Sequence, residues 1–338
     1  MNIHIKCQFS LAKRLLMKRL LAPPTLAEIE QARYRLTDLA LKTPLIRFDV
    51  DNAPGEIYLK LENLQPIGSF KLRPAGNALA ALDPAIRRRG VYTASSGNMA
   101  IGLAWAARQM GIPAAAVVCD PAPQIKLDHL TRLGARVIPL PFEQWWQVVC
   151  NHGLAGEPGQ FIHPVCNPAV LAGDATLGVE IIEELPDVET IVAPFGGGGL
   201  SCGIGAAVRA LKPEVRVLAC EKSEARPLAA ALAAGKPVSI APAPSFITGL
   251  DTTAVLDDMW PLARHLIDGA VSASRDEAAA AIRLLAERAH VIAEGAGAMA
   301  LAAALAGRAG GGKIVCVVSG GNIDPADLAT ALRGGVPD

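Results

Sequence analysis

The stretch Thr190-Ile-Val-Ala-Pro-Phe-Gly-Gly-Gly-Gly-Leu200 contains a short apolar strand, a glycine turn and the start of an apolar helix. Glycines let backbone N–H groups approach an anion closely, and a helix N-terminus adds positive potential. The stretch therefore predicts a phosphate-binding turn at the end of a strand. It does not fit the dinucleotide pattern G-x-G-x-x-G, because Ser201 and Cys202 stand where the last glycine is required. A plain turn is the alternative, although four consecutive glycines cost conformational entropy.

The same order of strand, turn and helix recurs along the chain. Repeated units of this kind predict an α/β fold with two domains, each an open, mainly parallel twisted sheet flanked by helices. Ligands of such sheets bind at the carboxyl ends of the strands. The predicted strands are 57–61, 90–93, 114–119, 136–140, 190–194, 216–220 and 313–318, and the predicted helices include 26–36, 275–289 and 296–306.

Two segments are interpreted as linkers: the charged, proline-bearing Asp83-Pro-Ala-Ile-Arg-Arg-Arg-Gly90 and the polar residues 151–160. The folded part is predicted to begin at a capping box, Thr25-Leu-Ala-Glu28. The predicted organisation is an N-terminal extension (1–22), a large cofactor-binding domain (23–82 and 156–338) and a small substrate-loop domain (83–155).

The composition points to a small-molecule partner. Lys+Arg and Asp+Glu both number 32 and aromatic residues make up 4%, so nothing favours nucleic acid or an anionic membrane. No apolar run reaches the roughly 18 residues expected of a membrane span. Seven scattered cysteines without a C-x-x-C pair predict a reducing compartment, and hence the cytoplasm.

Lys71 follows a Gly68-Ser-Phe turn and opens an apolar helical run. A helix N-terminus and apolar neighbours both disfavour the ammonium form, and an uncharged lysine amine can form a Schiff base. Taken alone, the residue fits an exposed lysine in a first helical turn equally well. The other loops decide between these interpretations.

Three further loops follow predicted strands or precede helices. Ser95-Ser-Gly-Asn98 combines two hydroxyls with helix-start N–H groups, which suits a carboxylate, although an ordinary helix cap is the alternative. Ser319, in Val318-Ser-Gly-Gly-Asn322, could offer a hydroxyl to a ring nitrogen. Glu294 stands before an alanine-rich helix, where a buried carboxylate needs a partner and an exposed one is a favourable helix-start charge.

In this order, the motifs Gly-Ser-Phe-Lys71, Ser-Ser-Gly-Asn98, Gly-Gly-Gly-Gly-Leu200 and Ser-Gly-Gly-Asn322 resemble the fold-type II pyridoxal-phosphate enzymes of the serine/threonine dehydratase (threonine ammonia-lyase) and serine racemase group. The resemblance runs from about Thr25 to the end. It implies a two-domain fold similar to tryptophan synthase β, pyridoxal 5'-phosphate as cofactor, and a homodimer.

The resemblance also implies a role for each matching residue. Lys71 would form the Schiff base with the cofactor and move protons, with Ser96 on the opposite cofactor face. Phe70 would pack on the cofactor ring, Asn98 would bind the ring hydroxyl, and Ser319 would bind the ring nitrogen. The implied cofactor-binding set is Phe70, Lys71, Asn98, Gly196, Gly197, Gly198, Gly199, Leu200, Glu294 and Ser319. The implied substrate-binding set is Ser95, Ser96, Gly97 and Asn98.

Some positions depart from the family pattern. Ser96 is a serine as in racemising members, where several dehydratases have alanine, so racemase activity is an open alternative. Met99 and Pro74 replace a usual histidine and glycine, which leaves the substrate side chain open. Of the residues that hold a divalent cation in racemase-like members, Glu221 and Ala225 match, but Pro227 replaces an aspartate. We predict no metal site, and no C-terminal regulatory domain because the chain ends soon after Asn322.

The predicted function is a pyridoxal-phosphate-dependent lyase that dehydrates and deaminates a β-hydroxy-α-amino acid such as L-threonine or L-serine to a 2-oxo acid and ammonia. The alternatives within the family are a serine racemase and a dehydratase of a bulkier substrate such as 3-phenylserine or 3-hydroxyaspartate. A nicotinamide oxidoreductase lacks its fingerprint here, and a non-catalytic cofactor-binding protein is the last alternative.

Overall fold

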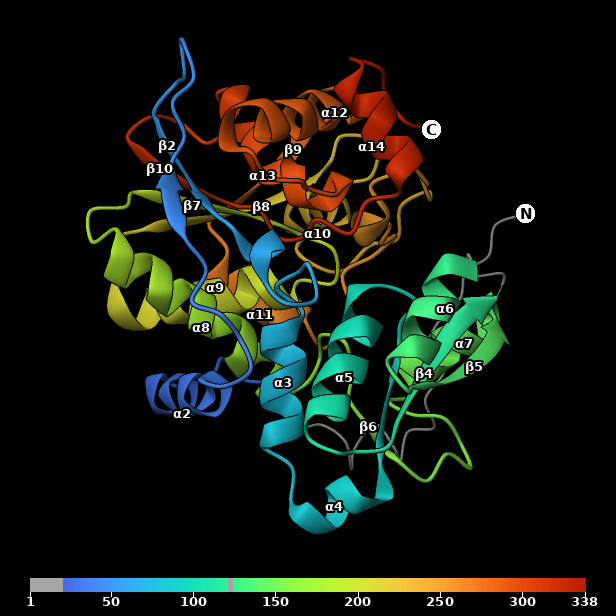
Figure 1. The fold of residues 1–338 in the computed structure, drawn as a ribbon. Helices are drawn as coiled ribbons and strands as arrows, with labels where there is room; N and C mark the ends of the chain where they lie inside the picture. Colours follow the sequence, from blue (N-terminus) through green and yellow to red (C-terminus); the bar gives the residue numbers. More distant parts are fainter. Residues whose placement is uncertain (1–20, 121–123) are drawn as a thin grey trace.

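Two mainly parallel β-sheets organise the computed structural model, which describes residues 21–120 and 124–338 (Figure 1). The larger sheet has six strands in the order β1-β2-β10-β7-β8-β9, and only the β1–β2 pair is antiparallel. The smaller sheet has four parallel strands in the order β5-β4-β3-β6. The predicted α/β fold class is confirmed.

The strands are β1 (Leu45–Arg47), β2 (Glu56–Lys60), β3 (Val91–Ala94), β4 (Ala114–Asp120), β5 (Arg136–Pro141), β6 (Gln160–Phe161), β7 (Thr190–Pro194), β8 (Arg216–Lys222), β9 (Gly269–Ala273) and β10 (Lys313–Val317). The α-helices are α2 (Leu26–Leu36), α3 (Leu72–Ala80), α4 (Pro84–Arg89), α5 (Asn98–Gln109), α6 (Gln124–Arg132), α7 (Phe142–Cys150), α8 (Pro168–Glu184), α9 (Gly199–Leu211), α10 (Pro227–Ala234), α11 (Trp260–Leu266), α12 (Arg275–Leu284), α13 (Gly295–Leu305) and α14 (Pro325–Leu332). Short helical turns are η1 (Glu62–Leu64), η2 (Thr248–Leu250) and the π-helical η3 (Leu285–Ala289).

Helices cover both faces of the large sheet, α12 and α13 on one side and α8 and α9 on the other (Figure 1). Strand β10 shows why its sequence is a continuous apolar run. Ile314 and Cys316 pack with the α13 side, whereas Val315 and Val317 pack with the α9 side. A strand buried on both faces needs apolar residues at every position.

Local sequence signals determine where several helices begin. At the start of α2, the side chain of Thr25 accepts a hydrogen bond from Glu28 N, and the carboxylate of Glu28 accepts one from Thr25 N. The predicted capping box is confirmed. The segment from Asp83 to Gly90, interpreted as a linker, is instead the helix α4. Asp83 caps it through a 2.7 Å bond from Ala85 N, Pro84 occupies its first turn, and Gly90 ends it with a φ of 90°.

The division into a large and a small domain stays a prediction. The small sheet does extend past residue 155, because β6 pairs with β3 through Val91–Gln160 and Tyr92–Phe161. The predicted N-terminal extension, residues 1–22, lies outside the described residues except for its last two.

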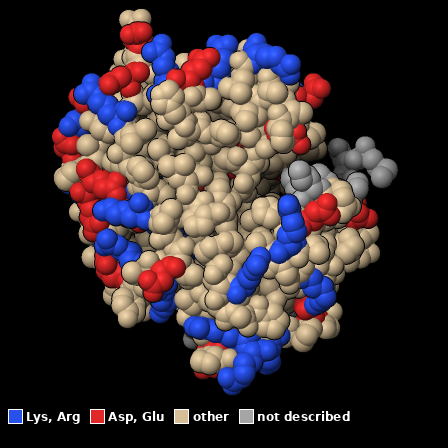
Figure 2. All heavy atoms as spheres, in the orientation of Figure 1, with Lys and Arg blue, Asp and Glu red and all other residues tan. Residues whose placement is uncertain are grey.

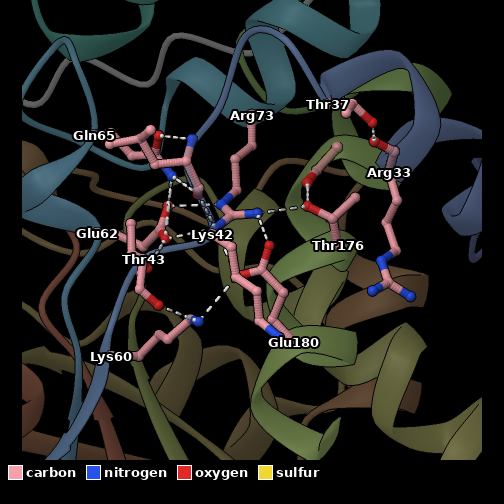
Figure 3. A network of polar contacts seen from close by, with 12 residues as sticks. Arg33, Thr37, Lys42, Thr43, Lys60, Glu62, Gln65, Arg73, Thr176 and Glu180 are labelled. Atoms are coloured by element: carbon pink, nitrogen blue, oxygen red, sulfur yellow. Dashed lines mark hydrogen bonds and ion pairs between the residues drawn. The ribbon is translucent and has the colours of Figure 1, made fainter. Parts of the chain in front are cut away.

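A buried ionic network ties α3 to its neighbours (Figure 3). The Arg73 guanidinium on α3 donates to Glu62 through 2.8 Å bonds from Nε and Nη2, and to Glu180 on α8 through a 2.7 Å bond from Nη1. Lys60 Nζ lies 2.9 Å from the second oxygen of Glu180. Arg73, Glu62 and Lys60 are at most 2% exposed, so these charges depend on protein partners and not on water for compensation.

Replacing Arg73 with methionine keeps much of the side-chain volume but leaves Glu62 and Glu180 with one less cation. Arg73→Met should lower the free energy of unfolding by about 3–5 kcal/mol, measured by urea denaturation. Arg33, which pairs with Glu183 at the surface, is the matched control. Arg33→Met should cost at most about 1 kcal/mol, and equal losses in the two variants would contradict this account of the network.

The surface carries no large field of one sign in the view of Figure 2. Acidic and basic side chains are interspersed along its rim, and uncharged atoms fill most of its middle. In the part of the chain that the structure describes, no helix has both the length and the apolar character needed to cross a membrane.

Candidate active site

The turn that carries Lys71 is joined to the carboxyl end of β10. Phe70 N donates to Ser319 O at 3.0 Å, and Ser69 and Gly320 form an antiparallel bridge. Lys71 is the N-terminal cap residue of α3. Two sequence-predicted loops that lie far apart along the chain are thus held side by side by backbone hydrogen bonds.

Lys71 itself is half-buried and makes few polar contacts. Its Nζ donates to Pro164 O at 3.1 Å and lies 5.0 Å from the centroid of the Phe70 ring. Burial lowers the pKa of the Lys71 amine, and the charge of Asp174 opposes this shift. The environment therefore favours the uncharged, nucleophilic form of the amine.

The glycine turn lies after β7 and opens α9. Its N-terminal cap residue, Gly198, has a φ of 92°, which favours glycine, and no side chain caps this helix. A Cβ on Gly197 would lie 2.8 Å from Val165 Cγ1, and one on Gly196 would lie 2.5 Å from Gly249 O. Side chains at these positions would collide with the surrounding residues, and the first N–H groups of α9 receive no side-chain cap, as an anion site requires.

The serine loop presents hydroxyls in fixed positions after β3. Ser95 Oγ accepts from Gly97 N and Ser96 Oγ accepts from Cys119 N, each at 3.1 Å. A hydroxyl that accepts these bonds keeps its hydrogen for donation. No side chain caps α5, which begins after Gly97, so the ordinary-cap interpretation of this loop is wrong.

Asn98 lies between Glu294 and Asn322. Its Nδ2 donates to Glu294 Oε1 at 2.7 Å, and its Oδ1 accepts from Asn322 Nδ2 at 2.8 Å. Asn322 also donates to Ile67 O at 2.9 Å. The side chain of Glu294 does not cap its own helix, α13, and Asn98 is one of its partners. A Cβ on Gly320 would lie 2.3 Å from Glu294 Oε1, which explains a glycine there.

The structure places the remaining predicted residues as follows. Ser319 is 3% exposed beside the Lys71 turn, and Leu200 is buried in the core cluster against which Phe70 packs. Pro74 approaches α8, since a Cβ on Gly173 would lie 2.7 Å from its Cα, and Met99 is buried in the core around α5.

Sequence reasoning missed two buried titratable residues near Lys71, His163 and Asp174. His163 Nδ1 accepts from Val165 N at 3.1 Å and from Cys166 N at 2.8 Å. Asp174 lies on α8, whose start was readable from the Asn167 cap and Pro168 in the first turn. Their closeness to Lys71 had no local signal.

Burial, reinforced by the charge of nearby His152, lowers the pKa of His163 to about 3. A neutral ring fits the two backbone donors. Because the unfolded chain binds this proton with a pKa near 6.5, stability is lost as the pH falls below 6.5 toward 3. His163→Asn keeps an acceptor oxygen without the basic ring. It should remove about 2 kcal/mol of the stability difference between pH 7.5 and pH 5, measured by chemical denaturation.

The matched control for this variant is the exposed His265. His265→Asn should leave the acid sensitivity unchanged, and an unchanged sensitivity in His163→Asn as well would overturn the assignment.

The family model described as pyridoxal-phosphate dependent enzyme matches residues 36–320. The chain belongs to this family. It is 39% identical over 306 residues to the L-threonine ammonia-lyase of Thermotoga maritima, covering 89% of this chain and 76% of that protein. It is 34% identical over 310 residues to the catabolic L-threonine dehydratase of Escherichia coli K12, covering 89% and 94%. The structure of maize serine racemase aligns with a TM-score of 0.85 and 30% identity over 92% of this chain and 98% of that one.

The residues present in this pyridoxal-phosphate enzyme fit the cofactor that its family requires. A glycine turn at a helix N-terminus without a side-chain cap suits the phosphate group, and the Lys71 amine with its lowered pKa suits the aldehyde. Ser319 adds a buried hydroxyl beside the lysine turn. The resemblance to the serine/threonine dehydratase and serine racemase group is confirmed.

The carboxylate of Glu221, which matches a cation ligand of racemase-like members, accepts backbone hydrogen bonds instead. Its Oε1 accepts from Leu228 N at 2.6 Å and its Oε2 from Ala229 N at 3.0 Å, at the start of α10. The adjoining Lys222 ammonium pairs with Asp251. Within residues 21–120 and 124–338 no group of three or more acidic, histidine or cysteine side chains is placed to hold a metal ion. The absence of a metal site stays a prediction.

Proposed function

We propose that this pyridoxal-phosphate enzyme dehydrates and deaminates a β-hydroxy-α-amino acid such as L-threonine or L-serine, releasing a 2-oxo acid and ammonia. The observation that carries the proposal is the Lys71 amine, whose pKa burial lowers, in a chain that also begins α5 and α9 with glycine and no side-chain cap. One of these helix starts suits a substrate carboxylate and the other a cofactor phosphate. Relatives named threonine ammonia-lyase and threonine dehydratase support the same chemistry.

The bound cofactor supplies an electron sink that acidifies the Cα–H of the amino acid. Lys71 Nζ then acts as the base that takes the Cα proton, a role that burial favours because it lowers the pKa of the amine. Ser95, Ser96 and Gly97, with the first N–H groups of α5, bind the substrate carboxylate and fix the orientation of the Cα–H bond. The C–O bond breaks as the hydroxyl takes up a proton, which balances the proton that Lys71 removed from Cα, and it leaves as water; addition of one water later releases the nitrogen as ammonia and leaves the 2-oxo acid.

We further propose how the chain holds the cofactor. Gly196, Gly197, Gly198, Gly199 and Leu200 donate backbone N–H groups to the phosphate. Phe70 packs on the ring, and Asn98 donates to the ring hydroxyl with Glu294 and Asn322 fixing its amide. Ser319 offers an uncharged hydroxyl to the ring nitrogen. Glu294 therefore acts through Asn98.

Serine racemisation is the second candidate function, because Ser96 supplies a hydroxyl fixed by Cys119 N. A protonatable group on the cofactor face opposite Lys71 is what inversion at Cα needs. The similarity to maize serine racemase supports it. Dehydration of a bulkier substrate, such as 3-phenylserine or 3-hydroxyaspartate, is the remaining alternative.

Removing the lysine amine tests the cofactor chemistry directly. Lys71→Ala should abolish the visible-range absorbance band of bound pyridoxal phosphate and lower 2-oxo acid formation by at least about 1,000-fold. The exposed Lys42, which pairs with Glu184, is the control, and Lys42→Ala should keep both the band and the activity. An unchanged band in Lys71→Ala would show that another amine holds the cofactor.

A substrate panel separates the lyase from the racemase. L- and D-threonine, L- and D-serine, 3-phenylserine and 3-hydroxyaspartate are assayed for 2-oxo acid and for the inverted enantiomer. We expect 2-oxo acid chiefly from L-threonine or L-serine. Ser96→Ala should abolish inversion and leave elimination within about tenfold of wild type. Inversion faster than elimination in the wild type would instead favour the racemase.

The cellular setting is also proposed. We infer a cytoplasmic homodimer with a small-molecule substrate and no nucleic-acid or membrane partner. Cys119, Cys166, Cys202, Cys220 and Cys316 carry free thiols and Cys150 is disulfide-bonded, so the inference of a reducing compartment rests on the sequence pattern alone. We also propose a large cofactor-binding domain (23–82 and 156–338) beside a small one (83–155), with β6 from the large-domain segment completing the small sheet.

A further inference from the structure

Asp174 is a buried carboxyl that no hydrogen bond satisfies. It lies on α8, its side chain is 0% exposed, and neither Oδ1 nor Oδ2 has a hydrogen-bond partner among the described residues. Burying an unpaired ionised carboxylate is costly, so such a group is retained against a cost in stability. A functional role would explain why the chain keeps a carboxyl at this position.

The carboxyl faces the start of the helix that the glycine turn opens. Asp174 Oδ2 lies 2.9 Å from the position that a Cβ on Gly199 would take, and Asp174 Cβ lies 2.6 Å from that of Gly203. A carboxylate at a helix N-terminus normally accepts the first N–H groups. Asp174 accepts none of them, so these donors stay available on the turn side.

The nearby cations do not pair with Asp174. On α3, the Arg73 guanidinium is engaged by Glu62 and Glu180, and Lys71 Nζ donates to Pro164 O. The groups that act on the carboxyl are Lys71 and Arg73 on α3, Glu62 on η1 and, on α9, the buried thiol of Cys202. Burial raises the pKa of Asp174 to about 7, opposed by Lys71 and Arg73 and reinforced by Glu62.

We propose that Asp174 carries a proton whenever a phosphate group occupies the glycine turn, so that binding of the cofactor phosphate takes up a proton from solvent. This inference rests on the proposed role of Gly196 to Gly199 as the phosphate-binding residues. A phosphate dianion close to an ionised carboxylate in a dry interior is strongly disfavoured. A protonated carboxyl removes that repulsion and adds a hydrogen-bond donor directed toward the turn.

The test uses the apoenzyme and pyridoxine 5'-phosphate, which keeps the phosphate ester but has no aldehyde to react with Lys71. Between pH 7 and pH 9 this ester is already a dianion, because its second pKa is near 6. Isothermal titration calorimetry in two buffers of different ionisation enthalpy measures affinity and proton uptake together. Above the carboxyl pKa, affinity should fall by up to about tenfold per pH unit, with uptake approaching one proton.

Two variants assign the proton to its residue. Asp174→Asn has nearly the same shape and no ionisable group, so its proton uptake and most of its pH dependence should disappear. Lys71→Ala removes the amine, which could also take up a proton when the phosphate binds. In this variant the proton uptake should persist. Pyridoxine without phosphate should take up no proton through Asp174. If Asp174→Asn misfolds, wild type and Lys71→Ala still measure the pH dependence of the affinity and the proton uptake, so the test remains decisive.

The outcomes distinguish this inference from the proposed function. Affinity independent of pH from 7 to 9, or proton uptake that vanishes in Lys71→Ala, would overturn the role of Asp174 even if threonine is dehydrated. Failure of pyridoxine 5'-phosphate to bind at any pH would overturn the phosphate-binding turn as well. Proton-linked binding without 2-oxo acid from any substrate would support Asp174 and refute the lyase.

Discussion

The geometry of this active site depends on the ion pairs that the Arg73 guanidinium makes with Glu62 and Glu180. Arg73 lies two residues after Lys71 and binds carboxylates from η1 and α8 at the same time. Leaving either carboxylate unpaired in the interior is costly, so η1, α3 and α8 share one relative placement. The Lys71 turn, the Pro164 carbonyl that precedes α8 and the Asp174 side chain on α8 all take their positions from it.

Around this anchor, the chemistry rests on backbone N–H groups that the chain leaves without side-chain caps. Side chains cap some helices of the chain, such as Thr25 at α2, Ser274 at α12 and Asp324 at α14, whereas α3, α7, α10, α11 and α13 also begin without a side-chain cap. At α5 and α9 it places glycine at the cap position instead. Glycine at a cap position costs only a few tenths of a kcal/mol relative to Ser, Thr or Asp. In return, the first N–H groups of these two helices stay without a side-chain partner, as an anion site requires.

Much of the fold was predictable because its signals are local. The capping box at Thr25 placed α2 to the residue, and the apolar runs at 190–194 and 114–119 predicted β7 and β4 within a residue. The Asp83–Gly90 segment was misread because its charges were taken for a linker, whereas Asp83 and Pro84 also begin a helix. The start of α8 had the signals Asn167 and Pro168, but its length of 17 residues comes from burial against α3 and α9 rather than from an amphipathic pattern.

The sequence alone determined the order of the motifs, the residue types at each strand end and the family to which they belong, because turns and caps depend on residues within a few positions of one another. Only the tertiary structure decided which polar groups meet. Asn98 and Asn322 are 224 residues apart and Arg73 and Glu180 are 107 apart, yet each pair is hydrogen-bonded. Such partners follow from how sheets and helices pack, and no local pattern encodes that packing. For the same reason the unpaired carboxyl of Asp174 beside the glycine turn became visible only in the folded chain.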